Sequence, residues 1–242
     1  MKEITSLQNP LIKHLVELRK ESGYRKEQKS VLISGYTMVK ELQPVTSLFI
    51  EKGYEVPTGI SYKTIYSVTR EILEKITGLK NPEPIAAETS LPETVYFSSP
   101  EFLLVLDSIS DPGNLGTLIR STLALGWSGA FLINSADPFN EKALRAAKGA
   151  TFRLPIQIGS YTELQELIQK KSAQAFVADI RGEPLNKKIT APIVLVLGNE
   201  THGPSEEIKK MCQPISIPMI GPMESLNVAS AGSILLHALR GL

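Results

Sequence analysis

The chain of 242 residues is long enough to bury one large or two small hydrophobic cores. Its 42% hydrophobic and 21% charged residues are typical of a soluble globular protein. A net charge of +1 does not indicate nucleic-acid binding, so any RNA contact must come from local basic patches or a second subunit.

The single cysteine and the three histidines limit the disulfides and metal sites that the chain can form. The single cysteine, Cys212, excludes an internal disulfide and fits a reducing compartment. The histidines His14, His202 and His237 are far apart in the sequence and have no cysteine pair near them, so no metal site is predicted.

The first residues have no signal-peptide core and no apolar run is long enough to span a membrane, so we expect a cytoplasmic protein without membrane contact.

Residues 1–90 are predicted to form a separate, compact α/β sandwich. Leucines at helical spacing predict a first helix near 10–21. The remaining elements alternate: strands at 31–33, 47–50 and 64–67, with helices near 36–42 and 69–76. The proline-rich residues 78–100 lead out of this unit, with one strand near 84–87, and residues 91–100 are the predicted linker.

A basic stretch, interrupted by glutamates, begins within the first predicted helix and continues beyond it. Its members are Lys13, Arg19, Lys20, Arg25, Lys26 and Lys29. Taken alone, a charge run of this kind is typical of a solvated helix face.

From Glu101 the composition changes. Residues 102–106 form a continuous apolar run, typical of a strand covered on both faces, and the run ends at Asp107. Asn114 is predicted to cap a helix that ends near Gly126. Arg120 lies six residues after Asn114, so its guanidinium can reach toward the electropositive start of that helix.

Three more strands are predicted at 130–133, 175–178 and 192–197. Helices are predicted at 142–147, with Asp137-Pro138 as a helix start, and at 161–171. The strand at 192–197 is followed by Gly-x-Glu-x-x-Gly from Gly198 to Gly203, a loop placed where ligands of open α/β sheets bind. A plain turn with Ser205 as a helix cap is the alternative.

The last thirty residues contain an apolar run at 215–220, which Gly221-Pro222 ends. Ser225 is predicted to cap a final helix with an apolar face. Residues 229–233 are all small, so a flat ligand or another backbone can approach closely.

Three motifs, in this order, identify a family resemblance. They are Asn-x-Gly-x-x-x-Arg at 114–120, Leu-Gly-x-Glu-x-x-Gly at 197–203, and Ile217-Pro218-Met219 with Ser225-Leu226-Asn227-Val228. Together they resemble the SpoU (TrmH-like) RNA ribose 2′-O-methyltransferases of the SPOUT superfamily. Neither a dinucleotide fingerprint nor a Walker A loop occurs in the chain.

The resemblance implies a fold and a cofactor. Residues 101–242 would form a SPOUT domain, an α/β fold with a parallel sheet, helices on both faces and a C-terminal trefoil knot, which works as a homodimer. S-adenosylmethionine would bind in loops at the strand ends, through Ala178, Leu197, Gly198, Ile217, Met219 and Leu226.

The resemblance also implies the catalytic residues Asn114, Arg120, Glu200, Ser225 and Asn227. Methyl transfer requires the hydroxyl, methyl group and sulfur to be aligned and one proton to be removed. Arginine is a poor base because its pKa exceeds about 12. We therefore expect Arg120 to clamp the target phosphate, with the proton going to that phosphate or to Glu200.

The opening residues Ile4–Pro10 resemble the start of the substrate-binding domain that precedes many SpoU catalytic domains. This implies that residues 1–90 grip RNA, with Asn9, Lys13, Arg25 and Lys26 as candidate contacts. The chain departs from the family at Ser34-Gly35, where members often have Glu-Gly. The expected substrate is 23S ribosomal RNA; a tRNA methyltransferase and a non-catalytic RNA-binding protein are the alternatives.

Overall fold

The computed structural model describes residues 1–98, 100–185 and 189–241. The chain divides into two compact units. The first contains Met1–Glu93 and the short stretch Phe139–Leu144, and the second contains Thr94–Pro138 and the chain from Arg145 onward. Within the described residues no helix is both long and apolar enough to cross a membrane.

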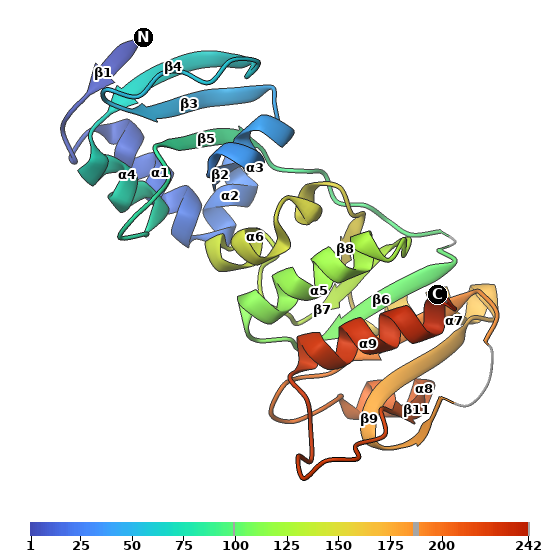
Figure 1. The fold of residues 1–242 in the computed structure, drawn as a ribbon. Coiled ribbons are helices and arrows are strands. Elements are labelled where there is room, and N and C mark those ends of the chain that lie inside the picture. Colours follow the sequence, from blue (N-terminus) through green and yellow to red (C-terminus); the bar gives the residue numbers. More distant parts are fainter. Residues whose placement is uncertain (99, 186–188, 242) are drawn as a thin grey trace. The chain divides into compact units, whose positions relative to one another are not determined.

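A five-stranded sheet organises the first unit (Figure 1). Its order is β1 (Lys2–Ile4), β4 (Tyr62–Val68), β3 (Val45–Glu51), β5 (Ile85–Ser90) and β2 (Ser30–Ser34). The strand β4 is parallel to both β1 and β3, whereas β5 is antiparallel to β3 and β2. The strand expected near 84–87 is therefore an interior strand of this sheet and part of the unit, not of an extended linker.

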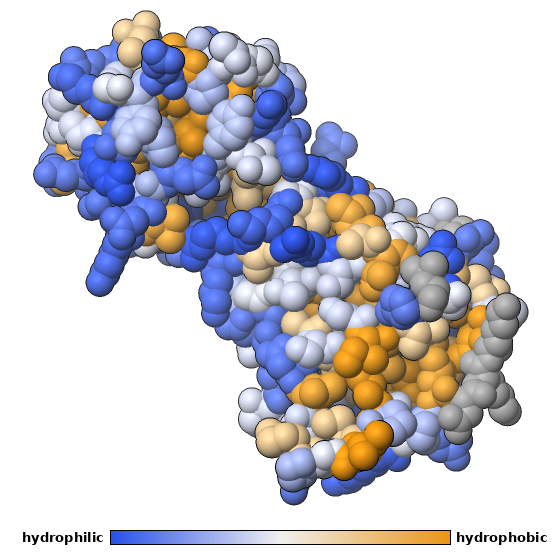
Figure 2. All heavy atoms as spheres, in the orientation of Figure 1, coloured by the Kyte–Doolittle hydropathy of each residue, from blue (hydrophilic) through white to orange (hydrophobic). Residues whose placement is uncertain are grey.

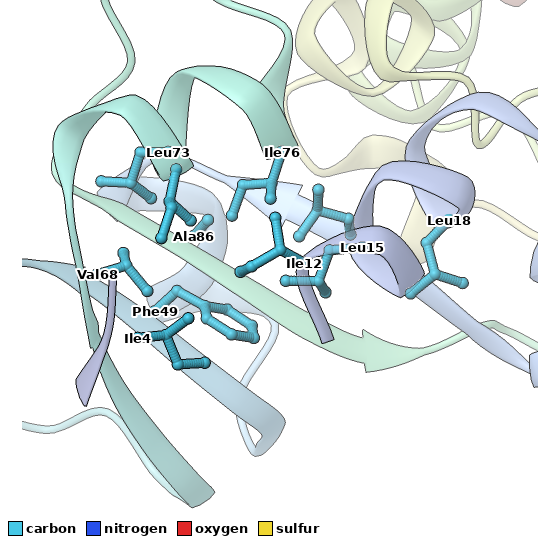
Figure 3. Packing of buried hydrophobic residues seen from close by; sticks show 11 residues of the cluster. Ile4, Ile12, Leu15, Leu18, Phe49, Val68, Leu73, Ile76 and Ala86 are labelled. Carbon is cyan, nitrogen blue, oxygen red and sulfur yellow. The ribbon is translucent and has the colours of Figure 1, made fainter. Parts of the chain in front are cut away.

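The core of this unit lies between the sheet and the helices α1 (Pro10–Lys20) and α4 (Arg70–Thr77). Figure 3 shows Ile12 and Leu15 of α1 directed toward Phe49 of β3, with Ile76 of α4 beside them. The predicted helices and strands of residues 1–90 are present, with α3 at Tyr36–Glu41. The sequence patterns did not predict α2 (Ser22–Gln28) or β1.

The second unit is built on a six-stranded, wholly parallel sheet. Its order is β11 (Gln213–Ser216), β9 (Gln174–Pro184), β10 (Ile193–Leu197), β6 (Phe102–Asp107), β7 (Gly129–Ile133) and β8 (Ile156–Ile158). The two continuous apolar runs, β6 and β10, are neighbours in the middle of this sheet, with Leu197 paired to Leu106. The segments that follow them therefore leave the sheet side by side, at its carboxyl edge.

Helices cover both faces of this sheet. α5 (Pro112–Ala124) and α9 (Val228–Arg240) lie side by side (Figure 1), with α9 packed on β10 and α5 on β7. α7 (Tyr161–Lys171) and α8 (Glu206–Met211) bury Leu164 and Ile208 against β6 and β10 on the other face. α6 (Glu141–Ala147) and the 3-10 turn η1 (Ala150–Phe152) precede β8. The predicted α/β class with a parallel sheet and helices on both faces is confirmed.

Several predicted boundaries in this unit are wrong. The strand placed at 175–178 continues to Pro184, because its far end pairs with Ile215 and Ser216 of β11 after a register shift. The apolar run 215–220 forms a strand only to Ser216, and the helix expected to start at Asp137-Pro138 begins at Glu141.

Candidate active site

The first motif begins with a cap that the sequence analysis misplaced. The Asp111 carboxylate accepts a hydrogen bond from the Asn114 backbone N–H at 2.9 Å, and Pro112 occupies the first turn. Asp111 therefore caps α5, and the prediction that Asn114 is the cap is wrong. Because Asp111 caps the helix and Asn114 is its third residue, the Asn114 amide side chain is available for contacts with other loops.

The second motif is a closed loop after β10. The backbones of Asn199 and Gly203 exchange hydrogen bonds at 3.1 and 2.9 Å. A Cβ on Gly198 would lie 2.3 Å from the backbone nitrogen of Pro204, so this close approach requires glycine. Ser205 accepts from the Ile208 N–H and caps α8, as the alternative interpretation of this loop expected.

Glu200 projects from this loop onto the first motif. Its carboxylate accepts four hydrogen bonds of 3.0–3.1 Å, from the N–H and hydroxyl of Ser110, the N–H of Asp111 and the side-chain amide of Asn114. Burial acts to raise the pKa of Glu200, but the hydrogen bonds from Asn114, Ser110 and Asp111 outweigh it and the pKa lies below its usual value. Glu200 is therefore held ionised, as the acceptor that joins the first two motifs.

The third motif is connected through Asn227. Its side-chain oxygen accepts from the N–H groups of Ala229 and Ser230, so Asn227 caps α9 and the prediction that Ser225 does so is wrong. The Asn227 amide nitrogen donates to the side-chain oxygen of Asn114 at 3.1 Å. A single hydrogen-bonded chain, Glu200–Asn114–Asn227, thus joins the three motif loops.

The small residues of α9 pack this helix against its neighbours. A Cβ on Gly232 would lie 2.4 Å from a methyl group of Leu118 on α5 and 2.5 Å from one of Leu197 on β10. The hydroxyls of Ser121 and Ser233 lie 2.8 Å apart. The close approach predicted for these small residues is therefore the contact of α9 with α5 and β10.

Residues 217–226, between β11 and α9, contrast with this packed helix. They make no hydrogen bond with any other residue in the described ranges. Four of their apolar side chains are exposed: Met219 is 38%, Ile220 101%, Met223 68% and Leu226 41% exposed. This segment therefore offers backbone donors and acceptors beside apolar side chains, and it is attached to the Glu200–Asn114–Asn227 chain through Asn227.

The other predicted cofactor residues lie on the adjacent strands. Leu197 and Gly198 are buried at the end of β10, and Ala178 is half-buried within β9. Arg120 is exposed on α5 and Ser225 is exposed before α9. Neither side chain forms a hydrogen bond or ion pair with another described residue, so no contact joins them to Glu200.

The predicted RNA contacts in the first unit differ in exposure. Lys13 and Lys26 are exposed. Asn9 caps α1 by accepting from the Leu11 N–H at 2.9 Å. Arg25 is only 2% exposed, and its guanidinium donates to the carbonyl of Leu18 at 2.6 Å at the end of α1. The prediction of an RNA contact at Arg25 is therefore corrected: this side chain secures α1.

Sequence reasoning missed several site residues. Ser110 and Asn199 supply hydrogen bonds that shape the site, and Asp107 is completely buried beneath it. The available signal was a charged residue at the end of a continuous apolar run, which seldom occurs without bonded partners. Among the described residues, no group of three metal-ligating side chains is placed to hold an ion.

The model of the SpoU rRNA Methylase family matches residues 101–237, which contain the three motif loops. A 23S rRNA (guanosine(2553)-2′-O)-methyltransferase of Bacillus subtilis is 29% identical, with 100% of both chains covered.

Two further proteins are similar over most of the chain. A 23S rRNA (uridine(2479)-2′-O)-methyltransferase of Streptomyces viridochromogenes is 29% identical over 84% of this chain and 82% of the relative. The crystal structure of an AdoMet-bound rRNA methyltransferase from Sinorhizobium meliloti superposes with a TM-score of 0.85 at 26% identity, covering 99% of this chain and 97% of that one.

Proposed function

Because the chain belongs to the SpoU rRNA methylase family, we propose that it transfers the methyl group of S-adenosylmethionine to a ribose 2′-hydroxyl of 23S ribosomal RNA. The observation that carries this proposal is the Glu200–Asn114–Asn227 chain, which holds the three family motifs together at the carboxyl edge of the sheet. The names of two relatives support the class of RNA. By their names, one of them acts on a guanosine and the other on a uridine.

The residues of the site fit S-adenosylmethionine. Adenine and the methionine part of this cofactor need backbone hydrogen-bond partners beside apolar surface. Residues 217–226 supply both, since their backbone has no other partner in the described chain and Met219 and Leu226 are partly exposed. We assign cofactor binding to residues 217–226, Ile217, Met219 and Leu226 among them, together with Ala178, Leu197 and Gly198. When bound, the cofactor supplies a methyl group on a positively charged sulfur.

Arg120 is the proposed catalytic residue. It is exposed on α5, and its guanidinium makes no hydrogen bond with the described residues that would occupy it. A guanidinium stays protonated at neutral pH and binds phosphate through paired N–H donors. We propose that Arg120 holds the phosphate next to the target ribose and thereby aligns the 2′-hydroxyl. Ser225, exposed at the same edge, is a second candidate contact.

Glu200 is a poor candidate for the group that accepts the hydroxyl proton. Its lone pairs are occupied by four donors, and its lowered pKa makes it a weak base. Its proposed task is to orient Asn114, which in turn orients Asn227. Of the two acceptors considered from the sequence, the RNA phosphate is therefore the better candidate.

We propose that the first unit binds the RNA substrate. In this proposal the RNA-binding domain is residues 1–90, the linker is residues 91–100, and the methyltransferase domain is residues 101–242. The contact residues we propose are Asn9, Lys13 and Lys26. A ribosomal RNA substrate also supports the expected cytoplasmic location.

A homodimer and a trefoil knot complete the proposal. Apolar residues gather on the face of the second unit over α9 (Figure 2), where Ile234 is 47% exposed. A second copy covering this face would bury it. The knot is supported by the path of the chain, which leaves the edge strand β11 and returns to pack α9 on β10 and α5.

The test uses RNA that lacks the modification. Ribosomal RNA and tRNA from cells without this protein are incubated with the purified enzyme and tritiated S-adenosylmethionine, and labelled riboses are mapped by mass spectrometry. We expect label at one 2′-oxygen of 23S ribosomal RNA. Label in tRNA alone would replace the substrate, and no label in any RNA would favour a non-catalytic RNA-binding protein.

The Arg120→Ala variant separates catalysis from folding in the same assay. We expect its kcat to fall at least about 100-fold, while cofactor affinity measured by calorimetry stays within about twofold. The Arg120→Lys variant keeps the charge but not the paired donors, so its activity should lie between the two. Full activity of Arg120→Ala would remove this residue from the mechanism.

A further inference from the structure

Asp107 is a buried carboxylate outside the three motifs. It is the last residue of β6 and is 0% exposed. Its Oδ1 accepts from the Tyr161 hydroxyl at 2.8 Å and from the Ser108 hydroxyl at 3.2 Å, and its Oδ2 accepts from the Ser205 N–H at 2.8 Å. A carboxylate is costly to bury without such bonds, so the position of this group is fixed by its donors.

The donors connect Asp107 to the Glu200 loop. Ser205 ends the loop, and Asn199, at its beginning, donates its side-chain amide to the Ser108 carbonyl at 2.7 Å. Both ends of the loop are therefore attached to residues 107–108. Glu200 lies between these attachments, and its orientation follows from them.

Tyr161 determines which way the carboxylate faces. It is the first residue of α7, on the sheet face opposite to α5 and α9, and its hydroxyl bonds only one of the two oxygens. With Oδ1 held by Tyr161 and Ser108, Oδ2 is directed at Ser205.

The Cys212 thiol lies near Asp107. Its burial, and the nearby Asp107 carboxylate, raise the pKa of this thiol to about 12.

We propose that Asp107 and Tyr161 are positioning residues for methyl transfer, which hold the loop after β10 so that Glu200 meets Asn114. Neither residue contacts substrate; both act through Glu200. This inference rests on the proposed function, because its main readout is the rate of methyl transfer.

The test begins with Tyr161→Phe, which removes one hydroxyl and leaves Asp107 two donors. We expect kcat to fall about tenfold, the factor for one hydrogen bond to a charged group. The KM for RNA and the affinity for S-adenosylmethionine should change less than about twofold. The matched control is Tyr96→Phe, because Tyr96 is 75% exposed and its hydroxyl has no partner in the described chain, and it should keep the normal kcat.

Substitutions of Asp107 give a graded result. Asp107→Ala should lower kcat about 100-fold, since it leaves three donors without their acceptor. Asp107→Asn should restore most of this loss, because the amide oxygen can accept from Ser205 while the Tyr161 hydroxyl turns to accept from the amide nitrogen. Equal activity of these two variants and the wild type would overturn the proposal.

A double-mutant cycle distinguishes positioning from general stabilisation. If Tyr161 acts through Glu200, Tyr161→Phe should change kcat less than about twofold in a Glu200→Ala background. The same tenfold loss in both backgrounds would overturn the proposal. If the wild type methylates no RNA, the proposed function fails, and amide hydrogen exchange of residues 199–203 and of Ser205 becomes the readout. Tyr161→Phe should then accelerate that exchange, and unchanged exchange would refute the positioning role.

Discussion

The replacement Glu200→Gln changes one oxygen of the site into an N–H₂ group. The four donors on Glu200 divide evenly, with Ser110 N and Oγ on one oxygen and Asp111 N and Asn114 Nδ2 on the other. In either orientation of the introduced side-chain amide, its N–H₂ group faces one of these two pairs of donors. The Ser110 hydroxyl can rotate, but a backbone N–H cannot, so at least one hydrogen bond is lost together with the charge.

The expected loss of stability follows from these contacts. A lost hydrogen bond to a charged group costs about 1.5–3 kcal/mol when it is buried. Because Glu200 is exposed and water replaces part of the interaction, we expect a decrease of about 1–2 kcal/mol in the free energy of unfolding. The same change should lower kcat, since Asn114 loses the acceptor that orients its amide.

Urea denaturation followed by tryptophan fluorescence measures this effect selectively. Trp127 is the single tryptophan of the chain and is buried in the second unit, so its emission reports on that unit. Glu166→Gln is the matched control, because Glu166 is exposed on α7 without a partner in the described residues. If the two variants lose the same stability, within about 0.3 kcal/mol, the reasoning is refuted.

The pH dependence provides an independent check. The pKa of Glu200 is lowered by folding, so its stabilising contribution is present above the unfolded value of about 4.3 and is lost as pH falls through the folded value. The stability difference between wild type and Glu200→Gln should be constant from about pH 7 to 5 and should shrink below about pH 4. An unchanged difference in acid would contradict the assignment of a bonded, ionised carboxylate.

Three further predictions test the packing around the site and the first unit. Gly198→Ala should lower stability by about 1–3 kcal/mol, because the added Cβ would meet the backbone of Gly203 and Pro204, and it should weaken cofactor binding in calorimetry. The control Gly23→Ala, with open space around the added Cβ, should not lower stability in thermal unfolding. Arg25→Met should destabilise the first unit by about 2–4 kcal/mol in circular-dichroism melts, whereas Lys26→Met should keep stability and weaken RNA binding in filter assays. Cys212 should resist iodoacetamide at pH 8 unless urea is added, since its pKa is about 12 and it is buried; rapid labelling of the folded protein would contradict its burial.

The two central strands were predictable because a strand covered on both faces must be apolar throughout. The predicted runs at 102–106 and 192–197 satisfy this condition, and the strands that they form, β6 and β10, are neighbours in the sheet. Their adjacency brought the loops of the first two motifs together. The shifted far end of β9 was not predictable, because most of its residues from Asp179 to Pro184 are polar or exposed and the strand end at Glu183 and Pro184 is defined by pairing with β11.

The helix caps show why residue type alone does not determine a role. Asp111 and Asn114 can both cap a helix, as can Ser225 and Asn227, and sequence rules do not rank them. In both pairs the structure uses the residue that the sequence analysis did not choose. The choice matters for function, because capping by Asp111 leaves the Asn114 side chain to bridge Glu200 and Asn227.

Burial of Arg25 had no signal in the sequence. It lies in a stretch whose other basic residues are mostly exposed, and only the fold of α1 and α2 places its guanidinium at carbonyls of α1. The strand β5 was predicted, but Pro82 and Pro84, which precede it, suggested that it belongs to a linker and not to the interior of the sheet.

The central claim is that the three motif loops form one binding site for the methyl donor. A crystal structure with bound S-adenosylhomocysteine tests this most directly. We expect the ligand to contact the backbone of Gly198 and of Leu226 at once, with the Glu200–Asn114–Asn227 hydrogen bonds intact. Ligand density that touches only one of these loops, or that lies away from the carboxyl edge of β6 and β10, would contradict the account.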